Sequence, residues 1–238
     1  MDVQALLEDA VLGAPEREAL RLSLSVALIA VAIALPLAVA AAWIVARSRT
    51  PGRGLLNALI HLPLVLPPIV VGYLLLLLLG IRGPLGSLLY AAFGFRIAFT
   101  MRAVIIATAV MILPVMVRAV RLGLDAIDRG LETAARTLGA SPVDVFATIT
   151  LPLMAPGLLT AVAIGFTAAL GEFGAVIIFA ANIEGETRTL PLAIYTALQQ
   201  PGGELAAARL AALSITLALI GLAANEWLAT RLRRRLGL

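Results

Sequence analysis

Few residues of this chain could do catalytic or metal chemistry. Its 238 residues include one histidine, His61, and no cysteine, which removes thiolate nucleophiles, disulfides and most metal-ligand sets. The sequence contains no glycine-rich phosphate-binding loop, and no two carboxylates share a face in a plausible cleft. We therefore expect no enzyme activity, no hydrolysis of ATP by the chain itself, and no cofactor or metal.

Glu172 is the most informative single residue, because it is the one acid in an otherwise apolar stretch long enough to cross a membrane. A carboxylate at membrane depth is costly, so it normally faces protein or water and has a partner. Gly171 and Gly174 flank it and permit close helix approach or a break in the helix. We place these three residues in a pathway or gate through the membrane, with Arg102 as the suggested partner. The alternative is that the helix ends here and that Glu172 lies in a water-filled outer vestibule.

A proline-rich stretch, HLPLVLPPIVVGY, provides two further pathway candidates, Pro67 and Pro68. Proline inside a helix removes a backbone hydrogen bond and bends the axis, and in lipid the freed carbonyl group needs another partner. Such helices occur where they pack in a bundle or line a cavity. Two interpretations stay open, a kink that merely fits the bundle and a pore-lining role.

A polar insert at 132–152 separates two apolar stretches and predicts two short helices. Gly139 suits the end of the first, Ser141 can cap the second, and Pro142 fits its first turn. Two acid-before-base pairs, four residues apart, support the first helix: Asp125 with Arg129, and Glu132 with Arg136. Apolar residues recur along it at helical spacing: Leu124, Ile127, Leu131, Ala135 and Leu138. A helix, a sharp turn and a second short helix form a shape suited to docking another protein.

The composition indicates a membrane protein. Hydrophobic residues make up 61% of the chain, charged residues 13%, and the mean hydropathy is +1.04. Five apolar stretches approach or exceed the ~20 residues that a helix needs to cross a bilayer core. They are residues 23–46, 55–79, 103–120, 153–180 and 206–228.

The arginines predict how these spans are oriented. All 18 basic residues are arginine, and most crowd three segments: the loop near residue 50, residues 118–136 and the C-terminal tail. The positive-inside rule places these segments in the cytoplasm. We therefore expect an N-terminal periplasmic segment at 1–20, a membrane domain at 21–230 with a cytoplasmic coupling loop at 121–152, and a cytoplasmic basic tail at 231–238. Topology accounts for the positive charge, so we expect no nucleic-acid partner.

The polar insert resembles the cytoplasmic loop of binding-protein-dependent ABC importer permeases. That loop follows the pattern Glu-Ala-Ala, three residues, Gly, nine residues, Ile, one residue, Leu-Pro. The positions that match it here are Ala134, Ala135, Gly139, Ile149, Leu151 and Pro152. Thr133 occupies the glutamate position, and Glu132 lies one residue early, which leaves the role of that acid open. The resemblance implies that the loop couples to an ATPase subunit through Thr133, Ala134, Ala135, Gly139, Ser141, Pro142, Val143 and Phe146.

Residues 20–230 as a whole resemble the molybdate permeases among the type I ABC importers, for example in LGEFGAVIIFAANIEGETRTLPLAIYT. The resemblance implies an all-α membrane fold of about five transmembrane helices plus cytoplasmic coupling helices. It also implies a homodimer in a prokaryotic inner membrane, with two cytoplasmic ATPase subunits and a periplasmic or lipid-anchored oxyanion-binding protein. The expected cargo is molybdate, with tungstate or sulfate and thiosulfate as alternatives.

Two functions from other classes remain as alternatives at this point. An ion-coupled secondary transporter would need inverted repeats or a cluster of acids within the membrane, and the sequence shows neither. A membrane sensor or assembly factor would explain the apolar spans but not a docking loop.

Overall fold

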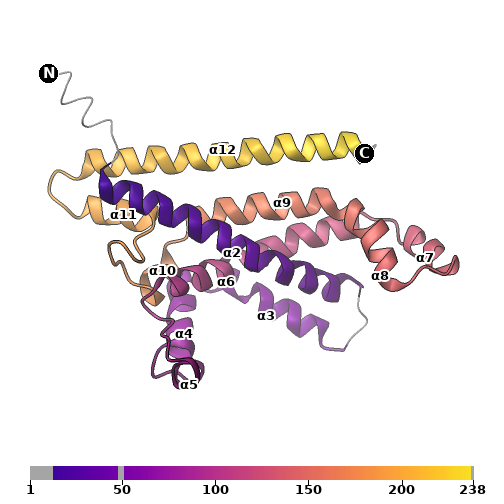
Figure 1. The fold of residues 1–238 in the computed structure, drawn as a ribbon, viewed down its shortest axis with the longest axis horizontal. Helices are drawn as coiled ribbons and strands as arrows, with labels where there is room; N and C mark the ends of the chain where they lie inside the picture. Colours follow the sequence, from indigo (N-terminus) through magenta and orange to yellow (C-terminus); the bar gives the residue numbers. More distant parts are fainter. Residues whose placement is uncertain (1–12, 48–50, 237–238) are drawn as a thin grey trace. The chain divides into compact units, whose positions relative to one another are not determined.

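The computed structural model describes residues 13–47 and 51–236, with the backbone alone at 232–236, and every regular element in this part is helical (Figure 1). Predictions for residues 1–12, for Arg49 and for most of the basic tail's side chains fall outside the described residues. The elements are α2 (Ala14–Arg47), α3 (Arg53–Val65), α4 (Pro68–Leu79), α5 (Pro84–Phe93), α6 (Met101–Asp125), α7 (Arg129–Thr137), α8 (Pro142–Val145), η1 (Phe146–Thr150), α9 (Leu151–Leu170), α10 (Gly174–Phe179), α11 (Leu190–Leu198) and α12 (Glu204–Leu236).

The long apolar helices confirm the predicted all-α membrane fold. Four helical runs in the described chain are long and apolar enough to cross a membrane: Ala14–Arg47, Met101–Asp125, Pro142–Leu170 and Glu204–Arg231. A fifth span results if the broken pair α3 and α4 is counted as one. These helices include or overlap the five predicted stretches.

Two of the five predicted spans are not continuous helices, because each contains a break. In the second, α3 ends at Val65 and α4 begins at Pro68, with Leu66 and Pro67 in extended conformations between them. Proline pushes the residue before it out of the helical region, and neither Pro67 nor Pro68 has an N–H to donate, so the helix cannot continue.

The fourth predicted span ends early. α9 stops at Leu170, and α10 begins only at Gly174. The break falls on Gly171–Phe173 because glycine tolerates departure from the helix and Phe173 has a φ of −132°. The alternative that the helix ends at Glu172 is therefore confirmed for the backbone, whereas the water-filled vestibule stays a prediction.

The described chain forms two compact units, whose boundaries fall inside α2, α6 and α12, between α3 and α4, and before the last residue of α9. Of the described residues, unit 1 comprises 13–29, 67–108 and 170–217, and unit 2 comprises 30–47, 51–66, 109–169 and 218–236.

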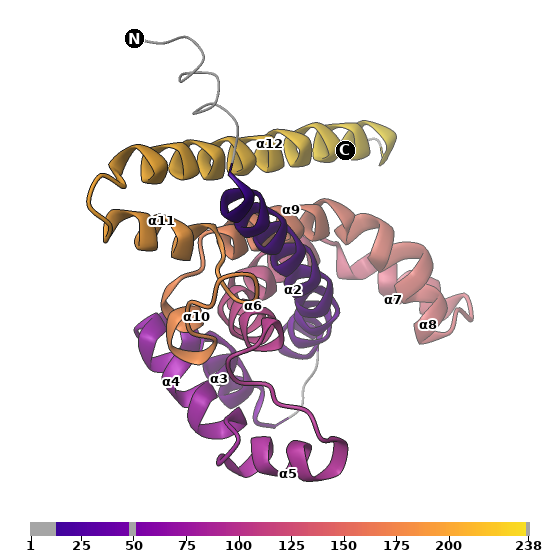
Figure 2. The same cartoon turned by 60° about the vertical axis from the view of Figure 1, so that its left-hand side comes forward.

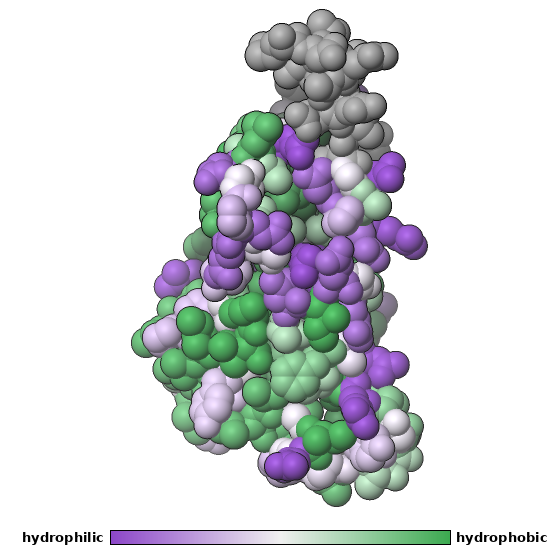
Figure 3. Space-filling view, turned by 90° about the vertical axis from the view of Figure 1, so that its left-hand side faces the viewer, coloured by the Kyte–Doolittle hydropathy of each residue, from purple (hydrophilic) through white to green (hydrophobic). Residues whose placement is uncertain are grey.

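Unit 1 contains an apolar cluster formed by the start of α2, by α11 and by the first part of α12, which lie side by side in Figures 1 and 2. Ala19, Leu190, Ala193 and Leu210 are its buried members. Ser23 on α2 caps α11, because its Oγ accepts the N–H of Leu190 at 2.7 Å. Figure 3 shows that apolar side chains gather over α4 and α5, with a band of polar side chains above them.

Unit 2 is built on a close crossing of α6 and α9. A Cβ atom added to Gly123 would lie 3.0 Å from the Cα of Gly157, and one added to Gly157 would lie 2.8 Å from the Cα of Gly123. Small residues allow such backbone contact between membrane helices, where lipid supplies no hydrophobic driving force for association. The contact fixes α6 and α9 together on either side of the polar insert.

Candidate functional site

The docking loop, which we define as residues 128–150, begins with a well-capped helix. Asp128 caps α7, its side chain accepting the N–H of Gly130 at 2.7 Å. At the other end Gly139 has a φ of +93°, its N–H donates to Arg136 O, and the N–H of Ala140 donates to Ala135 O. This pair of bonds is a Schellman motif, in which glycine supplies the left-handed residue. The predicted helix end at Gly139 is confirmed.

The second helix of the docking loop starts with the predicted cap. Ser141 Oγ accepts the N–H of Asp144 at 3.2 Å, and Asp144 Oδ2 accepts the N–H of Ser141 at 3.2 Å, which closes a capping box around Pro142. The helix is not separate, however. It continues through the π-helical turn η1 into α9, so the predicted second short helix is the first part of a long one.

Apolar side chains project from the docking loop. Leu138 is 89% exposed and Val143 is 74% exposed, whereas Phe146 is half-buried and packs edge-on against Trp43 with ring centroids 5.3 Å apart. Among the other predicted coupling residues, Thr133, Ala134, Gly139, Ser141 and Pro142 are exposed, and Ala135 is half-buried. Exposed apolar side chains in a polar, rigidly capped loop are typical of a docking surface.

The predicted apolar stripe does not form one face. Leu124 and Ile127 are buried near the end of α6, whereas Leu131 on α7 and Leu138 at its C-cap are exposed. The stripe is divided because α6 ends at Asp125 and the chain turns before Asp128 caps the next helix. The apolar residues keep helical spacing in the sequence even though the helix breaks between Asp125 and Arg129.

Both predicted ion pairs of this segment are wrong. Asp125 pairs with Arg121 at 3.4 Å, and Glu132 pairs with Arg47 at 3.4 Å. Arg129 donates a hydrogen bond to the carbonyl of Ala46 instead. The helix break before Asp128 takes Arg129 off the helix that carries Asp125, and Glu132 faces inward, away from the exposed Arg136.

Glu132 is the centre of a buried polar cluster that the sequence did not predict. Arg47 Nη2 lies 3.4 Å from Glu132 Oε1 and also donates to Leu124 O at 2.9 Å. Thr150 Oγ1 donates to the same carboxylate oxygen at 3.0 Å. The side chains of Arg47 and Glu132 are each only 8% exposed. Arg47 and Glu132 are too far apart in the sequence for a local pattern to predict their contact. The sequence offers one sign of it, because Glu132 directly precedes Thr133, the position at which the ABC permease loop has glutamate.

In unit 1, the predicted pathway acid has a backbone partner. Glu172 Oε1 accepts the N–H of Ala175 at 2.9 Å and thereby caps α10. The guanidinium of Arg102 lies 4.6 Å from the ring centroid of Phe95, and the described chain contains no ion pair between Arg102 and Glu172. The suggested pairing is therefore wrong. Arg188, which follows in the next loop, pairs with Glu184 at 2.9 Å.

Two of the predicted pathway residues meet where α4 packs on α10. A Cβ on Gly174 would lie 2.6 Å from Pro68 Cβ, and a Cβ on Gly72 would lie 2.5 Å from Ala175 O. The two helices thus touch backbone to backbone. Pro67 is the N-cap of α4, and Gly171 is exposed at the end of α9. Gly72 was missed, although a lone glycine in an apolar run is a known sign of close approach.

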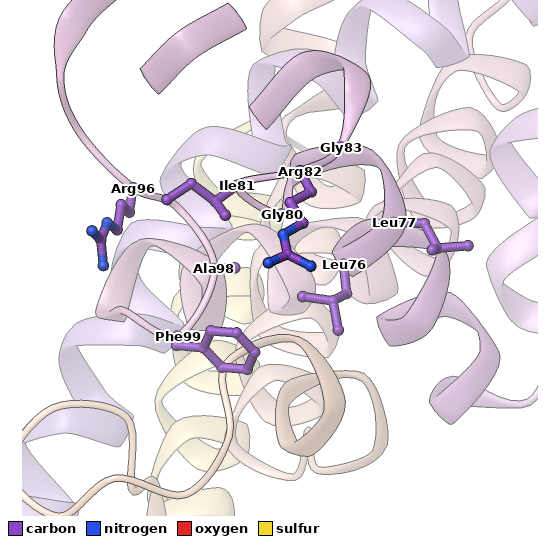
Figure 4. Close-up of a pocket in the computed structure, with 9 residues that line it drawn as sticks. All are labelled: Leu76, Leu77, Gly80, Ile81, Arg82, Gly83, Arg96, Ala98 and Phe99. Carbon is purple, nitrogen blue, oxygen red and sulfur yellow. The ribbon is translucent and has the colours of Figure 1, made fainter. Parts of the chain in front are cut away.

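A pocket of about 510 Å³ opens at the end of α4 (Figure 4). Figure 4 shows the side chain of Arg82 reaching in between Leu76 and Phe99, with Arg96 at the rim. Arg96 also lies 5.8 Å from the ring centroid of Tyr90. Both arginines lie between the second and third predicted spans, and nothing in the sequence indicated a pocket there.

Known proteins are similar to this chain over most of its length. The family model described as "Binding-protein-dependent transport system inner membrane component" matches residues 34–234. The molybdenum transport system permease protein ModB of Escherichia coli K12 is 52% identical over 227 residues, which cover 95% of this chain and 99% of that protein. The sulfate transport system permease protein CysT of the same strain is 41% identical over 159 residues, which cover 67% of this chain and 57% of that protein.

A solved structure shows the same fold. A chain in the crystal structure of a bacterial ABC transporter involved in the import of the acidic polysaccharide alginate has a TM-score of 0.74 at 15% identity, covering 92% of this chain and 80% of that one.

The family match also decides against a secondary transporter and a membrane sensor. From the match over 34–234, this chain belongs to the binding-protein-dependent transport system inner membrane components, the permease subunits of ABC importers.

Proposed function

We propose that this chain is the permease subunit of an ATP-driven importer that carries molybdate across the inner membrane. The observation that carries the proposal is the 52% identity with a molybdenum permease over nearly the full length of both chains. The similarity to the sulfate permease is lower and covers less of either protein. Sulfate, thiosulfate and tungstate are therefore the alternatives that an uptake experiment must separate.

The test is the uptake of labelled oxyanions by cells that lack only this chain. We expect high-affinity molybdate uptake to disappear, to return when the chain is supplied from a plasmid, and sulfate uptake to stay normal. Competition by unlabelled tungstate then shows whether tungstate shares the route. Loss of sulfate uptake with molybdate uptake intact would identify a sulfate permease instead.

The proposal includes partners on both sides of the membrane. A chain with no phosphate-binding loop needs a separate subunit to hydrolyse ATP, so we assign two cytoplasmic ATPase subunits to a homodimer of this chain. A periplasmic or lipid-anchored oxyanion-binding protein completes the system. Native mass spectrometry of the co-expressed complex tests the stoichiometry, and a complex with a single permease chain would contradict the homodimer.

We assign the docking loop to the ATPase interface, through Thr133, Ala134, Ala135, Gly139, Ser141, Pro142, Val143 and Phe146. Gly139 offers the sharpest test, because its positive φ is costly for a β-branched residue but tolerable for asparagine. Gly139→Val should reduce copurification of the ATPase and the hydrolysis stimulated by substrate. Gly139→Asn is the matched control and should retain both. If both variants gave the same copurification and the same stimulated hydrolysis, the left-handed turn at Gly139 would not matter for the ATPase interface.

The proposed orientation puts the N-terminus outside and the docking loop and C-terminus in the cytoplasm. Because the chain has no cysteine, a single Thr133→Cys variant reports on its own exposed position. A membrane-impermeant thiol reagent should label it in inverted vesicles and leave it unlabelled in intact cells. Labelling from the outside would reverse the orientation.

We place the translocation pathway or gate at the α4–α10 contact, with Pro67, Pro68, Gly171, Glu172 and Gly174. The support is the backbone contact between the two helices and the break in each span beside it. Gly171 is exposed, so Gly171→Cys should react with a small impermeant reagent at a rate that changes when ATP is trapped on the ATPase. A rate that is the same in every state would argue against a gate here.

A further inference from the structure

Helix α7 is held by a charge, unlike the helices around it. Glu132 is the one buried residue among Arg129–Thr137, and the rest of the helix is exposed or half-buried. A surface helix is normally held by an apolar face. Here the buried contact between α7 and the body of unit 2 is a carboxylate, together with the cation and the hydroxyl that surround it.

Three elements that are distant in sequence meet at this carboxylate. Arg47 is the last residue of α2, Glu132 lies in the first turn of α7, and Thr150 is the last residue of η1, directly before α9. Arg47 reaches a fourth point, the Leu124 carbonyl near the end of α6. Arg47 thus ties α7 to the end of α2 and contacts the end of α6, and Thr150 ties α7 to the start of α9, all within unit 2.

A buried polar contact differs from an apolar one in the motion it allows. The hydrophobic effect is not directional, so an apolar contact does not require one particular pair of atoms to stay together. A buried ion pair loses its compensation when the partners separate, so displacing one partner pulls the other along. The shared acceptor Glu132 Oε1 makes the positions of Arg47 and Thr150 depend on the position of α7.

We propose that Arg47, Glu132 and Thr150 form a latch that transmits displacement of the docking loop to α2 and α9. The three residues are positioning residues and touch neither cargo nor nucleotide. The inference rests on the proposed function, because it assumes that an ATPase moves the loop. It adds a route by which that movement enters the membrane helices.

The first arm of the test uses the permease alone and does not depend on transport. Glu132→Gln keeps the side-chain shape and the acceptor for Thr150 but removes the charge. We expect the amides of α7 to exchange hydrogen roughly tenfold faster or more than in the wild type, since the ionic anchor is lost. The matched control is Asp125→Asn, which neutralises the exposed pair with Arg121 in the same unit and should leave α7 unchanged. Exchange that is equal in the two variants would overturn the latch.

The second arm uses the complete complex with ATPase and binding protein. Glu132→Gln and Arg47→Gln should each keep the ATPase bound while the oxyanion imported per ATP hydrolysed falls, by roughly tenfold. Thr150→Val should lower the same ratio, and Thr150→Ser should restore it by returning the hydroxyl. Unchanged ratios in all of these variants would overturn the proposal.

The double variant Arg47→Gln, Glu132→Gln separates a latch from a merely structural pair. Replacing both charges removes the uncompensated charge that each single change leaves, so thermal stability should recover relative to the singles. A latch predicts that import per ATP stays low despite this recovery, whereas a structural pair predicts that import recovers too. A wild-type complex with intact α7 anchoring but no ATP-driven uptake would refute the proposed function and, with it, the transmission role.

Discussion

Two glutamates, Glu132 in the docking loop and Glu172 before α10, show opposite relations between sequence and surroundings. Glu172 stands alone in an apolar stretch, yet its carboxylate is satisfied by a backbone N–H at the start of α10. Glu132 stands among charged neighbours, yet it is buried against Arg47 and Thr150. Glu172, which is isolated among apolar residues in the sequence, is therefore not the acid that pairs with an arginine; Glu132 is. What decides it is whether a helix N-terminus or a side chain from a distant element is within reach.

The two regions also differ in how their backbones are held. In the docking loop, side-chain caps and a Schellman turn fix each helix end, so the loop keeps its shape with little burial. Around Glu172, glycine and proline bring α4 and α10 into backbone contact. Substitutions should therefore act through lost charge compensation in the first region and through steric overlap in the second.

The largest effect is expected at the buried pair. Glu132→Ala leaves Arg47 without its carboxylate, and breaking a buried pair commonly costs ~3–5 kcal/mol. Unfolding of the purified chain in detergent micelles measures the loss. A change below that caused by Glu172→Ala would reverse the contrast between the two glutamates.

A smaller but distinct effect is expected at the α4–α10 contact. Gly72→Ala places a Cβ atom 2.5 Å from Ala175 O, so the helices must separate, at a cost of ~1–3 kcal/mol. Gly54→Ala on α3 is the control, since a Cβ there meets nothing within 4 Å. The comparison of the two melting temperatures shows whether backbone contact holds this region. Similar melting temperatures would mean that it does not.

Glu172→Ala should cost less than either of these changes. It removes the cap of a six-residue helix, which typically costs ~0.5–2 kcal/mol, and it leaves no buried cation unpaired. Arg102→Gln should add its own effect independently, because Arg102 lies against Phe95. A double-mutant cycle on Glu172 and Arg102 measures the coupling energy, and a clearly non-zero value would restore the ion pair that the structure rejects.

The smallest effect is expected at the exposed pair of Arg121 and Asp125. Their side chains are 44% and 46% exposed, and pairs of this kind contribute ~0–1 kcal/mol. Asp125→Ala should therefore leave both stability and uptake close to wild type. A loss as large as that of Glu132→Ala would show that the docking loop depends on its charges in general and not on the buried cluster.

Local chemistry explains which features could be predicted from the sequence. Apolar length gave the membrane helices, and the types of Gly139, Ser141 and Pro142 gave the turn between α7 and α8, because caps depend on neighbours within four residues. The helix break at Leu66 was missed, and the break at Gly171 was one of two open alternatives, since proline and glycine permit either a kink or a break. The contacts of Glu132 with Arg47, and of Gly72 with Ala175, join segments far apart in the chain, where no local periodicity applies.

The π-helical turn Phe146–Thr150 has a consequence for how this loop can vary in length. A π-turn holds one residue more than the α-helical turn it replaces, so a single deletion within it would restore regular winding without a chain break. Because the turn absorbs its extra residue, the segments on either side of it would keep nearly the same relative rotation after such a deletion. A one-residue deletion in the regular winding of α9 would instead rotate α8 and the preceding loop by about 100° and draw them about 1.5 Å along the helix axis. The length of the chain can therefore change by one residue at Phe146–Thr150 with little change in the direction of α8, whereas the same change in α9 would re-aim it.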